Sequence, residues 1–170
     1  MREWQKWVVV IIELVLIVAA VIFVISVMRE LGIAEEGAEE RWVLCRPGSY
    51  VNVREKPKKT GAEGGRLECG DRIRTDGKIK NGYLHIVDAG TEQGDGWIHT
   101  GYIVDDKPEI RETEMVISGK GRVACRRWVG GKRKSWAKPG SAVKVYAIGG
   151  GWAVTNRGFI QSEYLEEEQR

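Results

Sequence analysis

An uninterrupted apolar run near the N-terminus limits what this chain can fold into. Residues 8–27 read VVVIIELVLIVAAVIFVISV, and the polar members of the run are Glu13 and Ser26. A helix of this length spans about 30 Å of hydrocarbon. A cleaved signal peptide, the competing interpretation, has an apolar region of roughly 7 to 15 residues and small residues before the cut. Because the run is longer and lacks an Ala-x-Ala motif, the sequence predicts one transmembrane helix over residues 8–28.

The residues beside this run suggest an orientation for it. Residues 1–7 contain Arg2, Lys6 and two tryptophans, as an interfacial anchor would, and the positive-inside rule mildly favours a cytoplasmic N-terminus. So short a tail holds no domain, so recognition is expected C-terminal to the helix. Glu13 lies within the span, where it is either protonated or snorkelling, or makes a polar contact with a helix of another membrane protein.

Composition changes sharply after the apolar run. Residues 29–41 are acidic and have no apolar stripe, which predicts a solvated stalk. From Trp42 onward short apolar runs alternate with glycines, and the chain contains 22 glycines and seven tryptophans. This mixture is typical of short strands and tight turns. The fold class expected for the remainder is therefore all-β.

The β region repeats itself. Two units are predicted, over residues 42–106 and 114–166, with a linker at 107–113 and a tail at 167–170. Each unit is expected to form about five short strands in a small barrel, with hairpins at glycine pairs such as Asp76-Gly77 and Asn81-Gly82. Four segments align in order: Cys45–Arg54 with Ile117–Arg126, Gly70–Thr75 with Gly140–Val145, Asn81–Leu84 with Gly150–Ala153, and Gly96–Ile103 with Gly158–Leu165.

The first unit resembles bacterial Src-homology-3 (SH3) domains. The residues that carry the resemblance are Val51–Arg54, Gly70-Asp71, Gly82–Ile86 and Gly96–Ile103; the second unit departs from it at Ala124-Cys125 and Ala153-Val154. The resemblance implies two tandem SH3-like β-barrels. Domains of this family typically lie outside the bacterial cytoplasm, and several bind peptidoglycan. It therefore implies a bacterial plasma-membrane protein whose barrels face the cell envelope and bind peptidoglycan or an associated anionic polymer.

Positive charge is concentrated in the second unit. Residues 115–162 contain ten Lys or Arg and no Asp or Glu, although the formal net charge of the chain is only +3. Cations interleaved with indoles can pair with anionic groups and stack on sugar rings. The predicted ligand-binding residues are Arg126, Arg127, Trp128, Lys132, Arg133, Lys134 and Trp136, together with Tyr50 and Tyr83 beside the lysine-rich loop 55–68.

The alternative interpretation is that these basic residues only keep an exposed loop solvated. The aromatic residues Trp97, Tyr102, Trp152, Phe159 and Tyr164 occupy alternating strand positions and are expected in the core instead. No nucleic-acid motif is present, so nucleic acid is not an expected partner.

The chain lacks the residue constellations of an enzyme or a metal protein. Its two histidines, His85 and His99, belong to no catalytic motif, and its three cysteines form no CxxC pair. Cysteines of this kind are usually small buried hydrophobes, with a Cys45–Cys69 bridge as the alternative. No catalysis, cofactor or metal is expected. The predicted function is membrane-anchored, non-catalytic envelope binding; the alternative is an adaptor or accessory subunit that binds another envelope protein.

Overall fold

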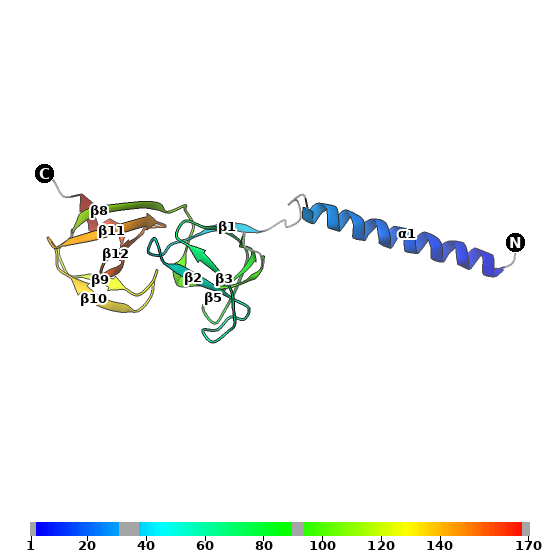
Figure 1. Cartoon of the computed structure of the whole chain (residues 1–170), viewed down its shortest axis with the longest axis horizontal. Coiled ribbons are helices and arrows are strands. Elements are labelled where there is room, and N and C mark those ends of the chain that lie inside the picture. Colours follow the sequence, from blue (N-terminus) through cyan, green and yellow to red (C-terminus); the bar gives the residue numbers. More distant parts are fainter. Residues whose placement is uncertain (1–2, 31–37, 90–93, 168–170) are drawn as a thin grey trace. The chain divides into compact units, whose positions relative to one another are not determined.

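The computed structural model describes residues 3–30, 38–89 and 94–167 and divides into two compact units, Met1–Gly37 and Ala38–Arg170 (Figure 1). The first unit is a helix, α1 (Glu3–Glu30), whose side chains are described at residues 13–24, 26 and 27. Among the described residues, no helix meets the length and apolarity needed to cross a bilayer. Parts of the predicted tails and stalk, residues 1–2, 31–37 and 168–170, lie outside the described residues.

The second unit is built of two antiparallel sheets with seven strands each, which confirms the β-rich fold. The first sheet has the order β3-β2-β6-β5-β4-β1-β7 and the second has the order β10-β9-β13-β12-β11-β8-β14. The strands of the first sheet are β1 (Glu39–Val43), β2 (Tyr50–Arg54), β3 (Glu63–Glu68), β4 (Arg72–Lys80), β5 (Tyr83–Asp88), β6 (Gly96–His99) and β7 (Ile103–Val104). The second sheet contains β8 (Glu109–Ile117), β9 (Val123–Arg126), β10 (Arg133–Ala137), β11 (Ala142–Gly149), β12 (Trp152–Thr155), β13 (Gly158–Gln161) and β14 (Leu165–Glu167).

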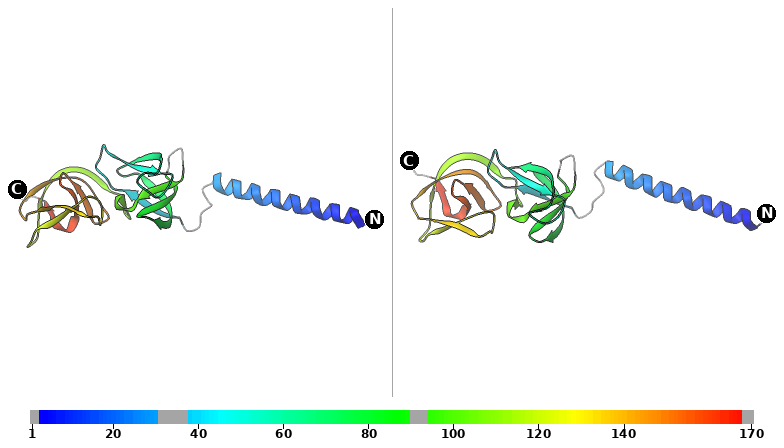
Figure 2. Two further views of the ribbon diagram at one scale, coloured as in Figure 1. Left: turned by 90° about the horizontal axis from the view of Figure 1, so that it is seen from below. Right: turned by 60° about the horizontal axis from the view of Figure 1, so that its bottom comes forward.

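The two sheets have equivalent topology, since each strand of the first corresponds to the strand seven positions later in the second. The four aligned sequence segments fall on equivalent strands, and a 3₁₀ turn, Thr100–Tyr102 or Ser162–Tyr164, precedes the last strand of each sheet. In both views of Figure 2 the strands of each sheet curve around an interior. The expectation of about five strands per unit is wrong. One strand that was missed is β3, because its sequence has no clear hydrophobic alternation. It lies inside the expected long loop and pairs with β2.

One of the two predicted hairpins is correct. Asn81 and Gly82 connect β4 to β5 with φ values of 52° and 77°, and Lys80 pairs directly with Tyr83, as in a type I′ turn. Asp76-Gly77 instead lies within β4, where the register with β5 shifts between Thr75 and Ile79. The Thr75 hydroxyl accepts a hydrogen bond from the Gly77 amide and donates one to the His85 carbonyl, which stabilises a bulge in place of a turn.

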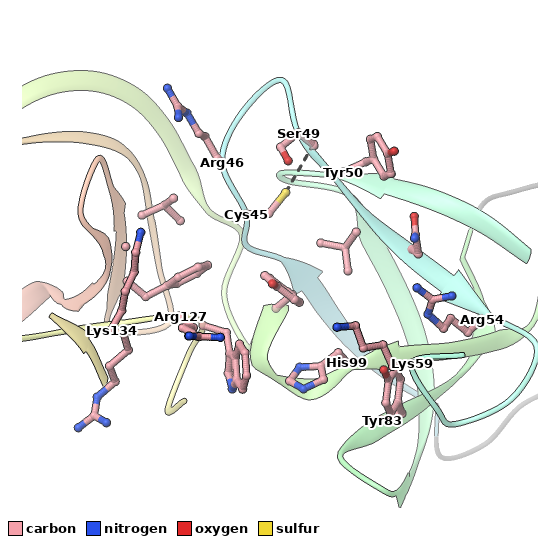
Figure 3. A pocket seen from close by; sticks show the side chains of 18 of the residues that line it. Cys45, Arg46, Ser49, Tyr50, Arg54, Lys59, Tyr83, His99, Arg127 and Lys134 are labelled. Atoms are coloured by element: carbon pink, nitrogen blue, oxygen red, sulfur yellow. Dashed lines mark hydrogen bonds between the residues drawn. The ribbon is translucent and has the colours of Figure 1, made fainter. Parts of the chain in front are cut away.

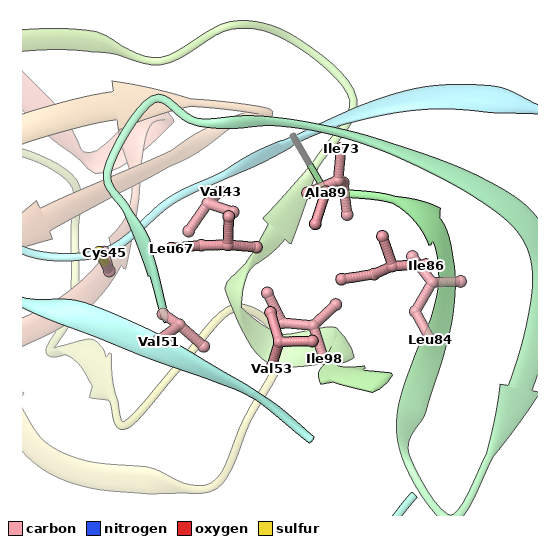
Figure 4. Close-up of a cluster of buried hydrophobic side chains, with 10 residues drawn as sticks. All are labelled: Val43, Cys45, Val51, Val53, Leu67, Ile73, Leu84, Ile86, Ala89 and Ile98. Carbon is pink, nitrogen blue, oxygen red and sulfur yellow. The ribbon is translucent and has the colours of Figure 1, made fainter. Parts of the chain in front are cut away.

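Each sheet encloses its own apolar core, and equivalent positions fill both. Val51 and Val53 point inward from β2, as Val123 and Cys125 do from β9. The first core is drawn in Figure 4 and consists of Val43, Cys45, Val51, Val53, Leu67, Ile73, Leu84, Ile86, Ala89 and Ile98. The second consists of Met115, Ile117, Val123, Cys125, Ala137, Val143, Val145, Ala153, Ile160 and Leu165.

A third apolar cluster joins the two sheets. Its buried members are Leu44, Val104, Ala147, Val154 and Phe159. The sheets approach closely because Gly150 has no side chain: a Cβ at this position would lie 2.7 Å from Cβ of Val104. The connection is also short, since β8 begins at Glu109, inside the stretch expected to be a linker. The second unit therefore contains two sheets, each curved around its own core and called a barrel for that curvature.

The aromatic residues expected in the barrel cores are distributed differently. Tyr102 packs against the first core and Tyr164 against the second, as expected, whereas Tyr102 also joins Trp152 and Phe159 in the cluster between the sheets. Trp97 is half-buried beside His85, with ring centroids 4.8 Å apart. The small apolar side chains Val, Ile, Leu and Ala fill the barrels, whose interiors are too narrow for many large rings. Three of the five rings, those of Tyr102, Trp152 and Phe159, instead lie in the cluster where one sheet docks on the other.

Candidate functional site

A groove of about 1210 Å³ runs along the junction of the two sheets (Figure 3). One wall comes from the β1–β2 connection, β2 and the loop that follows it, with residues such as Ser49, Tyr50 and Lys59. The other comes from the end of β9, from β10 and from the β12–β13 turn, with residues such as Arg127 and Lys134. The volume exceeds that of most small-molecule pockets, so the groove suits a segment of a larger ligand.

The groove is strongly cationic. Seven of its lining residues are Lys or Arg, and within the described part of the chain no Asp or Glu lines it. A concave surface lined by a single sign of charge concentrates counter-ions and attracts polyanions. The cations are Arg46, Arg54, Lys58 and Lys59 from the first barrel and Arg126, Arg127 and Lys134 from the second.

Two of these arginines stabilise the loops beside the groove. Nη1 of Arg54 donates a 2.8 Å hydrogen bond to the carbonyl of Gly61, and Nη1 of Arg126 donates an equivalent 2.8 Å bond to the carbonyl of Gly131. Both guanidinium groups are half-buried, and they occupy the same place in the two repeats. Their primary role is to fix the loop after the strand. The side chains of Arg127 and Lys134, by contrast, are exposed.

Aromatic rings line the groove between these cations. Tyr50 is 50% exposed, and the guanidinium of Arg66 lies 4.2 Å from its ring centroid. His99 lies at the centre of a ring cluster, with its centroid 5.4 Å from Tyr83, 5.0 Å from Trp128 and 5.8 Å from Tyr102. Burial lowers the pKa of His99 below its ordinary value of 6.5, and its Nδ1 accepts a 3.1 Å hydrogen bond from the Gly101 amide. The imidazole is therefore neutral near pH 7.

No protein-family model and no curated protein matches the chain. Two solved structures are similar over 79% of its length: NlpC1 from Trichomonas vaginalis, at 16% identity, and NlpC2 from the same organism, at 15% identity, each with a TM-score of 0.33. The chain spans about half the length of these two proteins, 48% and 50% respectively.

The structure brings two separately predicted groups of residues together. Of the nine predicted ligand-binding residues, Tyr50, Tyr83, Arg126, Arg127, Trp128 and Lys134 line the groove. The sequence placed Tyr50 and Tyr83 in one unit and the others in the second, and docking of the barrels makes them one site. Lys132, Arg133 and Trp136 do not line it. Instead the Arg133 guanidinium packs on the exposed ring of Trp136, 4.4 Å from its centroid.

A β-bulge explains why Lys134 differs from its neighbours. The pairing of β10 with β9 shifts register between Arg133 and Ser135, so Lys134 has no direct partner in the ladder. Alternation along a regular strand would give Lys134 and Trp136 the same face. The bulge breaks this alternation, and Lys134 lines the groove although Trp136 does not.

Trp128 is held in place by the first barrel. Its ring covers Gly101, where an added Cβ would lie 2.2 Å from Trp128 Cδ1, and the Val129 amide donates a 2.9 Å hydrogen bond to the Gly101 carbonyl. Trp128 is half-buried as a result. It acts as a joint between the barrels and offers only part of its ring to a ligand.

The groove also contains residues that had no signal in the sequence. His99, Asn81 and Asn156 line it, from an otherwise regular strand end and two hairpin turns. Cys45 and Arg46 line it from the β1–β2 connection, and Arg46 packs on Tyr146 of the other barrel at 4.5 Å. These residues line one groove because the two barrels dock, and no local sequence motif predicts this docking.

The equivalent end of the first barrel carries the opposite charge. A smaller cavity of about 290 Å³ is lined by Glu55, His85, Asp95 and Trp97, with two glycines. In the repeat, Glu55 corresponds to Arg127 and Asp95 to Arg157. The duplicated barrels have therefore diverged in charge at matching positions, and only the second contributes this end to the cationic groove.

Proposed function

We propose that the chain is a membrane-anchored, non-catalytic protein that binds peptidoglycan, or an anionic polymer associated with it, in the groove between its two barrels. Both barrels contribute to a single site. The observation that carries this proposal is the lining of the groove: seven cations, no acidic residue in the described part, and several aromatic rings.

The chemistry of the lining matches a carboxylate-bearing glycan. Lys58, Lys59, Arg127 and Lys134 can form charge-assisted hydrogen bonds with carboxylates or phosphates spaced along a polymer. The half-exposed ring of Tyr50 offers an apolar face to sugar rings. The groove volume of about 1210 Å³ suits a segment of a polymer.

A binding role also fits the titratable groups in the groove. His99 is neutral near pH 7, and its Nδ1 is occupied by the Gly101 amide. Contact with the Cys69 thiol and burial together raise the pKa of the Cys45 thiol far above its ordinary value, so this thiol is protonated at neutral pH while Cys69 is reduced. Both His99 and Cys45 are therefore uncharged near pH 7, which supports recognition of a ligand by the cationic side chains of the groove.

The helix α1 is proposed as the anchor. It contains 28 residues, about 42 Å of helix, and residues 8–27 include only two polar side chains. Its described side chains expose a continuous apolar surface, with Leu14 63%, Ile17 61% and Phe23 69% exposed. An exposed apolar surface of this extent is typical of a segment that contacts a membrane or another protein. Contact with a bilayer would tether the chain and raise the local concentration of the groove near its ligand.

The orientation proposed is a cytoplasmic N-terminus with the barrels in the envelope. It is supported by Arg2 and Lys6 before the apolar run 8–27 and by the resemblance of the first repeat to bacterial SH3 domains. The equivalent strand order of the two sheets is consistent with this resemblance.

A co-sedimentation experiment with purified peptidoglycan sacculi tests the proposal. The fragment 38–170, which has its own cores, is compared with two charge reversals, Lys134→Glu in the groove and Lys132→Glu outside it. Losing one charge-assisted hydrogen bond costs about 1.5–3 kcal/mol, so Lys134→Glu should weaken retention roughly tenfold or more. Lys132→Glu has the same change in net charge and should leave retention nearly unchanged.

A second matched pair tests the aromatic contribution. Tyr50→Ala removes a half-exposed ring from the groove, and Trp136→Ala removes a similarly exposed ring, 45%, from outside it. Only Tyr50→Ala should reduce retention. Equal effects within each pair would contradict binding in the groove. Absence of retention, together with co-purification of a membrane protein that Glu13→Leu abolishes, would favour the adaptor function instead.

A further inference from the structure

Two free cysteines meet at the edge of the first barrel core. Cys45 follows β1 and is 4% exposed, whereas Cys69 follows β3 and is half-buried, packed against the same core cluster. Two backbone hydrogen bonds hold the segments together: the Gly70 amide donates to the Val43 carbonyl at 2.8 Å, and the Val43 amide donates to the Asp71 carbonyl at 2.9 Å. Figure 4 shows Cys45 at the margin of this core.

The two thiols interact directly and unequally. The contact with the Cys45 thiol lowers the pKa of Cys69 to about 7, against the opposing effects of burial and Asp71. The same contact raises the pKa of Cys45, with further contributions from burial and from Asp71 and Glu68. A partly exposed thiolate beside a protonated, buried thiol is the arrangement of an attacking and a resolving cysteine.

We propose that Cys69 and Cys45 form a thiol–disulfide exchange site that accepts low-molecular-weight disulfides and closes into an intrachain disulfide. The exchange reaction does not require polymer binding, although Cys45 lines the groove. The accessible sulfur of Cys69 receives the first bond, and the buried sulfur of Cys45 completes the reaction.

The reaction balances in two steps. The Cys69 thiolate attacks one sulfur of a disulfide RS–SR, forming Cys69–S–SR and releasing RS⁻, which takes a proton from solvent. The Cys45 thiol then loses its proton to solvent and attacks the Cys69 sulfur, and the second RS⁻ leaves and is protonated. Two protein thiols are oxidised to one disulfide, and RS–SR is reduced to two RSH.

The disulfide would act on one wall of the groove. Cys45 lies in the connection from β1 to β2, and its sulfur lies 3.7 Å from the Ser49 carbonyl oxygen, a contact drawn as a dashed line in Figure 3. Cys45, Arg46 and Ser49 all line the groove. Cross-linking Cys45 to the residue after β3 restrains this connection.

The reaction can be followed on the full chain in detergent micelles. The reduced protein is incubated with glutathione disulfide at pH 7.5, and intact mass and tryptic maps are recorded over time. The wild-type chain should become lighter by two hydrogen atoms, and the map should contain a cross-linked peptide that joins Cys45 to Cys69. Cys125, which is fully buried, supplies the control, and Cys125→Ala should react as the wild type does.

Two variants separate the steps. Cys45→Ser should stop at the glutathione adduct on Cys69, and Cys69→Ser should form neither an adduct nor a cross-link. The proposal is overturned if the wild type accumulates a stable Cys69 adduct without the cross-link. It is also overturned if the disulfide that forms includes Cys125, or if the wild type remains reduced while the unfolded chain reacts.

Discussion

Substituting Gly101 tests whether the two barrels are locked together by Trp128. An alanine Cβ at this position would lie 2.2, 2.5 and 2.8 Å from Cδ1, Cγ and Cβ of Trp128, so the indole must move. Gly101 is buried, and it does not have the positive φ that would strain an alanine. Its amide also keeps its hydrogen bond to His99. The expected cost therefore comes from overpacking alone, about 1–3 kcal/mol.

The assay is urea unfolding of the fragment 38–170, with a double-mutant cycle. Gly121→Ala is the control, because nothing lies within 4 Å of its added Cβ, and it should change the free energy of unfolding by less than about 0.5 kcal/mol. In a Trp128→Ala background the two contacts with the indole are gone and only the contact with Cβ of residue 128, at 2.8 Å, remains, so Gly101→Ala should cost clearly less than in the wild type. Equal costs for the two glycine substitutions, or a cost of Gly101→Ala that persists in full without Trp128, would refute the reasoning.

Three further predictions address pH, a turn and oxidation. Because burial lowers the pKa of His99 below its ordinary value of 6.5, the unfolded chain binds more protons than the folded chain as the pH falls through 6.5. The free energy of unfolding should therefore decrease over this pH range. His99→Gln should reduce this pH dependence, which calorimetry at pH 5 to 7.5 measures. Gly82→Ala places an alanine at φ 77° and should cost about 1 kcal/mol in urea unfolding, and an unchanged midpoint would contradict the type I′ turn. A Cys45–Cys69 disulfide closes a loop of roughly 25 residues and should stabilise the chain by up to about 3.5 kcal/mol, read as a rise in Tm that Cys45→Ser abolishes.

The duplication and the strand positions could be predicted from the sequence because they depend on local patterns. Alternation in Val51–Arg54 and its counterpart Val123–Arg126 sets which side chains point inward, and both segments became equivalent strands. The Asn81-Gly82 turn was predictable for the same reason, since two consecutive residues with positive φ favour this pair. Asp76-Gly77 was misassigned because the hydroxyl of Thr75 stabilises a bulge, an interaction that depends on the neighbouring strand.

The candidate groove could be predicted only in part, because it depends on docking. The sequence identified Tyr50, Arg127 and Lys134 as surface residues suited to an anionic ligand, but it did not indicate that the two repeats share one site. That arrangement follows from small residues such as Ala147 and Gly150, which allow close approach of the sheets. The same docking packs Trp128 on Gly101, so this residue joins the two barrels and also lines the groove.

Chemical-shift mapping of the fragment 38–170 by NMR tests the central claim most directly. The fragment is titrated with disaccharide-peptide fragments of peptidoglycan that carry free carboxylates. The account predicts concerted shifts in both barrels at once, at Tyr50, Tyr83 and His99 in the first and at Arg127 and Lys134 in the second. Shifts confined to one barrel, or centred on Trp136 at the edge strand β10, would contradict a shared binding groove.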